Sequence, residues 1–510
     1  MNRTELAELA QALDLSEADI EDGAKRIACE VKKRAELWQS TGANDDAIAR
    51  NLRRIVRRHH VDLPAKDSLA QRLNRMLDAS WWRRALRKRF RVVEQHEIAC
   101  GAVHRQASPY VSPKALRRHE RNVRRLIELL KTFEAINLDT GEAIPLAELI
   151  AKSQANPVMR RMAMMARTKG IEAHYTALGH EALFVTITAP SRMHARHQSG
   201  QANARFDGTT PRQAQTYLHD VWRRAMRSAA RQGLTACGLR TVEPHHDGCP
   251  HWHVLVFTPS GHAQALRNTL QRHALADSPN EPGAAAHRFT VERIDPAKGS
   301  ATSYIAKYVS KSIDGHGIDD DTESDGDGPT TARRVVAWAR LHGIRQFQFF
   351  GLPAITPTRE LYRHDGHGLG SNALTEAHQA CKAKNYAGYL ATLAAHGIAF
   401  DVRYEERPSS RYAGEIAHAI RGLMAGADDL AEPVSLTTRT ATWIIQPRPA
   451  QHEDAAHCAP WTRFNNCAPP VESTGYAHST RAASAPIRSE AREGRRRRPQ
   501  ATAGPASVPA

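Results

Sequence analysis

Apolar residues recur at helical spacing from the start of the chain to about residue 178, and arginine and lysine crowd the remaining faces. This pattern predicts a helical N-terminal region over residues 1–178. The basic residues are densest in three stretches, at 51–60, 80–91 and 116–126.

The pattern changes near residue 179, where short runs of β-branched and aromatic residues replace the helical spacing. The predicted order is strand, helix, strand, strand, helix, strand, with one more helix and strand at the end. That order is typical of a ferredoxin-like, or RRM-like, domain with a central antiparallel sheet. We therefore expect an α+β chain with this domain over 179–352. The strands are expected at 182–190, 238–243, 251–257, 287–294 and 345–350, and the helices at about 210–232, 261–275 and 300–313.

Residues 353–450 form a mixed region, with helical spacing near 372–396 and 412–425 and a strand-like run at 440–445. From 451 to 510 proline, alanine, serine and arginine dominate, which predicts a disordered basic tail. The acidic stretch at 319–328 resembles a calcium-binding loop, but Ala332 stands where that loop needs a glutamate. We expect a flexible acidic linker there.

The charge balance adds a partner to this picture. Lysine and arginine number 71 against 54 acidic residues, a formal net charge of +17. Such a surplus favours a polyanionic partner, nucleic acid before membrane, because basic side chains displace counterions from phosphates. In the stretch 80–91 tryptophans alternate with arginines, and we expect Trp81 and Trp82 to lie on the buried face of that helix. The residues expected to face DNA are Arg83, Arg84, Arg87, Lys88 and Arg89.

Targeting signals and cysteine pairs are not found in the sequence. The chain contains no apolar run of about 18 residues and begins with an acidic amphipathic segment, so neither a transmembrane helix nor a signal peptide is expected. Its seven cysteines lack CxxC spacing, which favours reduced thiols in a cytoplasm and argues against a zinc cluster.

Two histidines stand out on the third predicted strand. His251 and His253 are two residues apart, so both side chains leave the same face of the strand. Taken alone, the pair also fits two hydrogen-bonded histidines. A third ligand follows from the hairpin over 243–251, which places Glu243 beside His251. A His-His-carboxylate set with open positions suits Mg²⁺ or Mn²⁺. The loop supplies fallback ligands in His245, His246 and Asp247.

Tyrosines and lysines share a face of the helix at 300–313. Tyr304, Lys307, Tyr308 and Lys311 follow the spacing i, i+3, i+4 and i+7, and the apolar residues occupy the opposite face, which can pack on the sheet. The tyrosine face is therefore turned away from the apolar stripe of this helix. A phenol with a pKa near 10 needs nearby cations to act as a nucleophile at neutral pH. An ordinary amphipathic helix with half-buried tyrosines also fits this pattern.

The combination resembles a known family. PHWHVLVF at 250–257 resembles the His-hydrophobic-His motif of the HUH endonucleases, with Trp252 as the bulky central residue. YIAKYVSK at 304–311 resembles their two-tyrosine motif, and FVTITAPSRMH at 184–194 their first motif. The succession of EPHHDGCPHWHVLVF, RIDPAKGSATSYIAKYVSKSIDG and GIRQFQFFG is similar to the replication gene A proteins of temperate tailed phages. The similarity covers about residues 80–365.

The resemblance implies an enzyme that nicks a phage origin to start and end rolling-circle replication. His251 and His253 would hold a divalent metal ion, Mg²⁺ or Mn²⁺, against the scissile phosphate. Tyr304 or Tyr308 would attack it, forming a 5′-phosphotyrosine and freeing a 3′-hydroxyl for host polymerase. The second tyrosine would cut the regenerated origin, and the displaced strand would then close into a circle.

The remaining expectations concern charge and partners. Lys307 or Lys311 would balance phosphate charge or assist proton transfer. The expected partners are single-stranded and supercoiled double-stranded DNA at an origin, host DNA polymerase and, because the sequence contains no P-loop, a host helicase. The expected compartment is the cytoplasm of a bacterial host.

Three other functions fit part of this pattern. A two-tyrosine HUH transposase would use the same residues, and the similarity between the motifs favours replication. A noncatalytic DNA-binding or replication-control protein would not need intact histidines and tyrosines. A histidine-triad nucleotide hydrolase needs a further alternating histidine, but position 255 is leucine.

Overall fold

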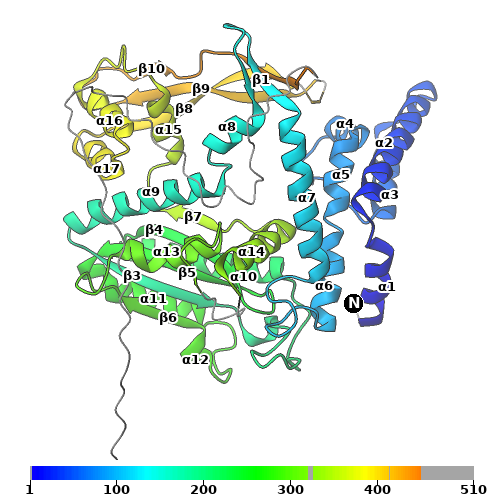
Figure 1. The fold of residues 1–510 in the computed structure, drawn as a ribbon, viewed down its shortest axis with the longest axis horizontal. Helices are drawn as coiled ribbons and strands as arrows, with labels where there is room; N and C mark the ends of the chain where they lie inside the picture. The colour runs from blue at the N-terminus through cyan, green and yellow to red at the C-terminus, as the bar shows by residue number, and fades with distance from the viewer. Residues whose placement is uncertain (1–2, 320–325, 410, 413, 450–510) are drawn as a thin grey trace, which may run out of the picture. The chain divides into compact units, whose positions relative to one another are not determined.

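The computed structural model describes residues 3–319, 326–409, 411–412 and 414–449, all within one compact unit (Figure 1). In these ranges the chain is a mixed α/β protein, mostly helical, with three antiparallel sheets. The predicted mixture of helices and antiparallel strands is thus confirmed. The tail predicted for 451–510, and residues 320–325 of the predicted acidic linker, lie outside the described residues. Among the described helices, none is both long and apolar enough to cross a membrane.

The largest sheet holds five strands in the order β6-β3-β5-β4-β7, and every neighbouring pair is antiparallel. β5 lies at its centre and is buried along nearly its whole length, as suits the apolar run Val254–Phe257. All five strands were predicted to within a few residues. They are β3 (His180–Thr188), β4 (Cys237–Pro244), β5 (Pro250–Pro259), β6 (Phe289–Arg293) and β7 (Phe347–Phe350).

The two faces of this sheet pack against different helices, because side chains alternate along each strand. Trp252 and Val254 of β5 lie in one core with α10 and α11. Leu255 and Phe257 point to the other face and share a core with Ile305 of α13 and with α9. The histidines of β5 belong to this second face, so the strand directs them towards α13. The four helices are α9 (Pro157–Ala177), α10 (Pro211–Arg231), α11 (Ala263–Ala274) and α13 (Ala301–Lys311).

N-cap residues mark the start of the two helices α10 and α13. Thr210 caps α10 through a reciprocal capping box with Gln213, and Ser300 caps α13 by accepting from the amide of Ser303. The helices predicted at 210–232, 261–275 and 300–313 are confirmed. A further helix between α13 and β7, α14, was not expected; its Trp338 is fully buried against the sheet. These remaining elements are α12 (Ala284–His287) and α14 (Gly328–His342).

Helices make up the first part of the chain, as the apolar spacing predicts. Their core gathers around Trp82, which is fully buried and donates from Nε1 to the Met76 carbonyl. The helical prediction is wrong over 133–145, where β1 and β2 pair around a turn at Gly141, whose φ of +74° suits glycine. The elements are α1 (Arg3–Leu13), α2 (Glu17–Ser40), α3 (Asp45–Arg58), α4 (Leu69–Leu77), α5 (Ala79–Arg87), α6 (Phe90–Cys100), α7 (Pro113–Lys131), β1 (Phe133–Asn137), β2 (Ala143–Pro145) and α8 (Leu146–Lys152).

The C-terminal part corrects a second prediction. The prediction of a helix at 412–425 is wrong, because Ile416–Gly426 form strand β9 between β8 and β10. The apolar residues there happen to follow helical spacing, but pairing on both edges decides the conformation. This pairing requires glycine at position 422, because a Cβ there would come within 1.9 Å of the Leu436 carbonyl oxygen on the neighbouring strand. The flanking strands are β8 (Ala399–Pro408) and β10 (Val434–Thr437).

The single helical stretch expected at 372–396 is two helices. Lys384 adopts a left-handed backbone, with φ of 55°, and Asn385 then caps the second helix. The strand expected at 440–445 is found at Trp443–Pro447 as β11, which pairs with β1 and so joins distant parts of the chain. The helices are α15 (Ile355–Arg363), α16 (Asn372–Lys382) and α17 (Tyr386–Ala395).

Candidate active site

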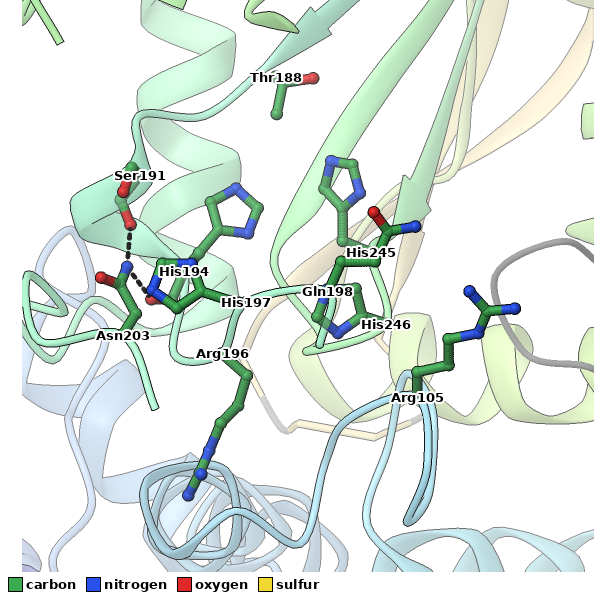
Figure 2. Close-up of a pocket in the computed structure, with 10 residues that line it drawn as sticks. All are labelled: Arg105, Thr188, Ser191, His194, Arg196, His197, Gln198, Asn203, His245 and His246. Carbon is green, nitrogen blue, oxygen red and sulfur yellow. Dashed lines mark hydrogen bonds between the residues drawn. The ribbon is translucent and has the colours of Figure 1, made fainter. Parts of the chain in front are cut away.

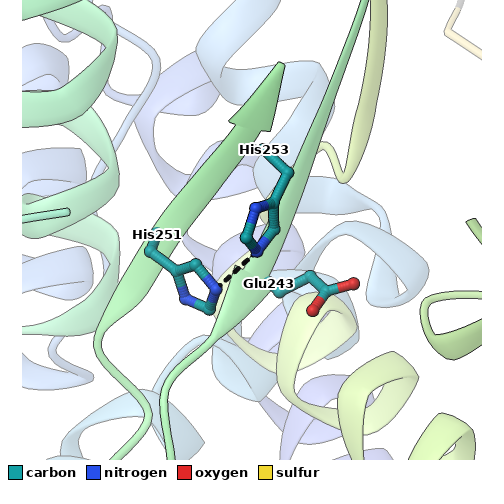
Figure 3. Close-up of side chains that lie close together, drawn as sticks. All are labelled: Glu243, His251 and His253. Atoms are coloured by element: carbon teal, nitrogen blue, oxygen red, sulfur yellow. Dashed lines mark hydrogen bonds between the residues drawn. The ribbon is translucent and has the colours of Figure 1, made fainter. Parts of the chain in front are cut away.

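Strand pairing brings together the three residues proposed as metal ligands. His251 lies opposite Glu243 of β4, as the hairpin predicts, and His253 follows on the same face of β5. The Nε2 atoms of the two histidines are 2.8 Å apart, and one ligand atom from each of the three residues lies within 4.8 Å of the others (Figure 3). All three side chains are buried. Trp252, between the histidines, points to the opposite face.

The chemistry of this cluster fits a divalent cation. Burial, with the nearby charges of His245 and His253, holds the pKa of His251 well below its usual range. Its imidazole is therefore neutral at pH 7, and a ring nitrogen can donate an electron pair to a metal ion. Its Nδ1 is buried with no hydrogen-bond partner among the described residues. Thr186 of β3 contacts Nδ1 of His253 at 3.1 Å, which orients the other ring nitrogen towards the cluster. Two imidazoles and a carboxylate gathered in this way match a metal site with open positions.

Glu243 already has a cationic neighbour. The ammonium of Lys311 lies 3.6 Å from its carboxylate, and the Ser312 hydroxyl donates to it over 3.4 Å. Both members of the ion pair are almost completely buried. Lys307, by contrast, is exposed. The two lysines of α13 are therefore in different surroundings, with Lys311 beside the proposed ligands and Lys307 open to solvent.

The tyrosines of α13 are half-buried and pack against the core that this helix shares with the sheet. The ring of Tyr308 lies against that of His253, with centroids 3.8 Å apart, and stacks on Phe184 of β3 at 5.2 Å. The Tyr304 hydroxyl donates to Glu292 of β6 over 3.4 Å. The negative charge of Glu292 is the main cause that raises the pKa of Tyr304. Helical spacing fixed the common face of these residues but not which neighbours cover it.

A residue from α9 holds the start of the tyrosine helix. The Glu172 carboxylate accepts from the amides of Ala301 and Thr302, at 2.6 and 2.9 Å, and from the Thr302 hydroxyl. A carboxylate at a helix N-terminus satisfies free amides and complements the helix dipole. Sequence analysis missed Glu172, since no local signal links it to a helix about 130 residues later.

The loop between β4 and β5 joins the cluster to a pocket. The ring of His245 stacks on His251 at 3.9 Å. Asp247 instead pairs with His194 at 3.3 Å and is not among the residues whose ligand atoms gather in the cluster. Burial opposes a charge on His194, yet its neighbours Cys249 and Asp247 hold its pKa well above the usual range. At neutral pH the carboxylate is the relevant anion, because burial raises the pKa of the Cys249 thiol.

The pocket itself has a volume of about 340 Å³ and lies beside this loop (Figure 2). Arginines and histidines from three segments line it, together with Gln198 and the strand-end residue Thr188. His194 ends the stretch that resembles the first motif, and its place in the pocket follows only from the fold.

Most of the basic residues predicted to face DNA come from α5. Arg87 pairs with Glu17 at 2.8 Å, and Arg84 lies 3.8 Å from Asp78. Trp82 is buried, as expected for the inner face. Among these residues Arg84 and Lys88 are exposed, whereas Arg83, Arg87 and Arg89 are half-buried.

Comparison with known proteins agrees with the motifs. The family model described as bacteriophage replication gene A protein (GPA) matches residues 7–316. The chain belongs to this family. It is 37% identical over 424 residues to the replication protein of Haemophilus phage HP1, covering 78% of this chain and 53% of that protein. With the replication gene A protein of Escherichia phage 186, the identity is 34% over 399 residues, covering 76% and 57%.

A third relative carries a name that describes an activity. It is the probable replication endonuclease from a prophage-like region of Salmonella paratyphi A, 35% identical over 428 residues, covering 78% of this chain and 52% of the relative. The chain thus spans about half the length of the curated relatives it matches. No solved structure matches the chain.

Proposed function

We propose that the chain is a metal-dependent DNA nicking and joining enzyme that starts and ends rolling-circle replication at a phage origin. Tyr308 and Tyr304 are its nucleophiles, and His251, His253 and Glu243 hold a divalent cation, Mg²⁺ or Mn²⁺. The observation that carries this proposal is the contact of Tyr308 with His253, which puts a phenol directly beside a buried His-His-Glu cluster.

The fold supports the same proposal. The first four strands of the large sheet lie in the order β6-β3-β5-β4, with α10 and α11 as the connecting helices on one face. This is the arrangement expected for a ferredoxin-like sheet with a split βαβ unit. Both proposed motifs then meet on the other face of the sheet, one from β5 and the other from α13.

In the nicking step the protein supplies the nucleophile and its position. A bound divalent ion would polarise the scissile phosphodiester and neutralise charge on its oxygens. The Tyr308 hydroxyl oxygen attacks phosphorus, and a tyrosine–phosphate bond forms as the bond from phosphorus to the 3′-oxygen breaks. The departing oxygen gains a proton in place of the one the phenol loses. Because the new phosphoester keeps the energy of the broken one, joining needs no ATP.

The second tyrosine allows the reaction to end. Tyr304 lies one helical turn from Tyr308, and its hydroxyl donates to the Glu292 carboxylate. Once Tyr308 carries the 5′-phosphate, Tyr304 can cut the regenerated origin, and the released 3′-hydroxyl then attacks the first phosphotyrosine. The exposed Lys307 balances the charge of the phosphate in this proposal. Lys311 instead neutralises the charge of the Glu243 carboxylate.

The wider role rests on the family. A replication protein of this kind would bind single-stranded and supercoiled DNA at an origin in the host cytoplasm, with host helicase and DNA polymerase as partners. We assign the basic residues in and directly after α5 to nonspecific contact with that DNA, chiefly the exposed Arg84 and Lys88. Membership of the replication gene A family favours replication over transposition for this chain.

The test is a denaturing assay for protein bound covalently to DNA. The purified chain is incubated with Mn²⁺ or Mg²⁺ and single-stranded oligonucleotides tiled across its own gene and flanks. We expect an adduct that EDTA abolishes. It should disappear in the Tyr304→Phe, Tyr308→Phe double variant and persist in Tyr362→Phe, which changes an exposed tyrosine on α15 outside the site.

Tight binding without any adduct would contradict the proposal, provided that a related nicking enzyme is active in parallel. That result would instead support a noncatalytic DNA-binding protein. Joining of cut ends to unrelated DNA would favour the transposase alternative.

A further inference from the structure

The pocket beside the histidine cluster has a defined place along β3 and β5. The pairing places Phe184 opposite Leu255, and Thr188 opposite His251. Tyr308 stacks on Phe184, whereas Thr188 lines the pocket. Tyr308, the proposed metal ligands and the pocket therefore follow one another along the same face of the sheet, at about 3.3 Å of strand per residue.

The pocket shares a wall with the cluster. His245 lines it and stacks on His251 at 3.9 Å. Figure 2 shows His245, His246 and Gln198 among the residues that line the pocket. A group bound there would therefore lie beside the proposed metal ligand His251.

The lining suits a nucleotide in both charge and size. Arg105 contributes a guanidinium group, the histidines contribute rings, and the exposed Gln198 contributes an amide. The guanidinium of Arg196 instead donates to the Gly200 carbonyl, away from these groups. None of the described residues that line it is acidic, and the nearby Asp247 is paired with His194. Aromatic rings and guanidinium planes stack on bases, while amides bind base edges. A volume of about 340 Å³ matches a small ligand rather than a single ion.

We propose that this pocket binds the nucleotide on the 5′ side of the nick, the one whose 3′-oxygen leaves, and so contributes to choice of the cut site. In phosphoryl transfer the attacking and leaving oxygens lie roughly in line on opposite sides of phosphorus. Tyr308 approaches from the Phe184 end of the sheet, so the leaving oxygen points towards the Thr188 end, where the pocket opens. The inference rests on the proposed function, because it needs Tyr308 as the attacking group.

The test uses oligonucleotides that span the nick mapped by the adduct assay. One substrate carries an abasic nucleotide immediately 5′ of the nick, another carries it immediately 3′, and a third is intact. Rates of adduct formation are measured for the wild type, for a His197→Ala, Gln198→Ala double variant, and for Gln264→Ala as a matched control on α11. His197, Gln198 and Gln264 are all exposed, so these changes should leave folding intact.

We expect the 5′ abasic site to slow the wild type and the Gln264→Ala variant roughly tenfold, as loss of one or two hydrogen bonds would. The double variant should be slowed to a similar extent on intact DNA, and the 5′ abasic site should slow it no further. The effect of the 3′ abasic site should be the same in all three proteins.

Three results would overturn the inference. The first is an unchanged rate of the wild type on the 5′ abasic substrate. The second is simple addition of the losses caused by the double variant and by the 5′ abasic site. The third is non-additivity at the 3′ nucleotide in place of the 5′ nucleotide. If the wild type forms no adduct on any substrate, the proposed nicking and joining function itself is contradicted. This outcome is distinct from the other three.

Discussion

The ring of Tyr308 lies against the imidazole of His253, with centroids 3.8 Å apart and planes inclined by 33°. One turn earlier on the same helix, the Tyr304 hydroxyl instead contacts Glu292. The two candidate nucleophiles therefore have different neighbours, a proposed metal ligand for one and a carboxylate for the other. We infer that Tyr308 is placed for the first attack and that Tyr304 acts afterwards.

Removing a histidine of the cluster should abolish metal binding. We expect His251→Ala or His253→Ala to weaken Mn²⁺ affinity at least 10- to 100-fold, the loss typical when even an outer partner of a metal ligand is changed. Titration calorimetry with Mn²⁺ alone measures this without DNA. His418→Ala, an exposed histidine on β9, is the control. Unchanged affinity in both cluster variants would show that the metal is held elsewhere.

The two lysines of α13 should differ in their effect on stability. Lys311→Met leaves the buried Glu243 without its cation, so we expect a loss of about 3 kcal/mol in EDTA, measured by urea unfolding. Saturating Mn²⁺ should restore much of this loss, because a bound cation can take over the carboxylate. Lys307→Met, at an exposed position, should change stability little in either condition. If Lys311→Met loses the same stability with and without Mn²⁺, Glu243 is not a ligand of the metal.

Glu172 should control the start of the tyrosine helix. Because its carboxylate accepts from the Ala301 and Thr302 amides, Glu172→Ala should destabilise the protein by about 1–2 kcal/mol. Hydrogen exchange at these two amides should become faster, and adduct formation should slow on both tyrosines together. Glu181→Ala, which removes the partner of the exposed Arg293, serves as a control. Unchanged exchange at residues 301 and 302 would contradict this role.

Stability should fall as pH rises through the range set by Glu94 on α6. Burial, partly offset by hydrogen bonds from Ser112, raises the pKa of Glu94 from 4.5 to about 7. The folded state thus binds the proton of Glu94 more tightly than the unfolded state does. The contribution of this proton to the free energy of unfolding is therefore complete below pH 4.5 and is lost above pH 7. The difference corresponds to about 3 kcal/mol. Unfolding by urea at pH 5 and pH 8 should show this decline in the wild type and not in Glu94→Gln; an equal decline in both would assign it to other groups.

The central sheet and its histidines could be predicted because their signals are local. Strand periodicity put His251 and His253 on one face, and hairpin geometry put Glu243 beside them. The burial of Lys311 could not be predicted, because helical spacing defines a face but not what covers it. Glu172 and His194 reach the site from distant parts of the chain, so only the tertiary fold reveals them.

The errors have a similar origin. The residues of β9 alternate poorly and repeat at helical spacing, and only their pairing with β8 and β10 makes them a strand. The hairpin of β1 and β2 was hidden within a long helical pattern, and β1 gains a second partner in β11 from the far end of the described chain.

The residue that carries the DNA can be identified by trypsin digestion of the covalent adduct, because cleavage after Lys307 separates the two tyrosines into peptides 299–307 and 308–311. After nuclease trimming, mass spectrometry locates the added nucleotide. We expect it on the peptide 308–311 in the wild type, and on 299–307 only when Tyr308 is replaced by phenylalanine. A nucleotide on any other peptide, or nicked DNA without covalently bound protein, would contradict the proposed mechanism.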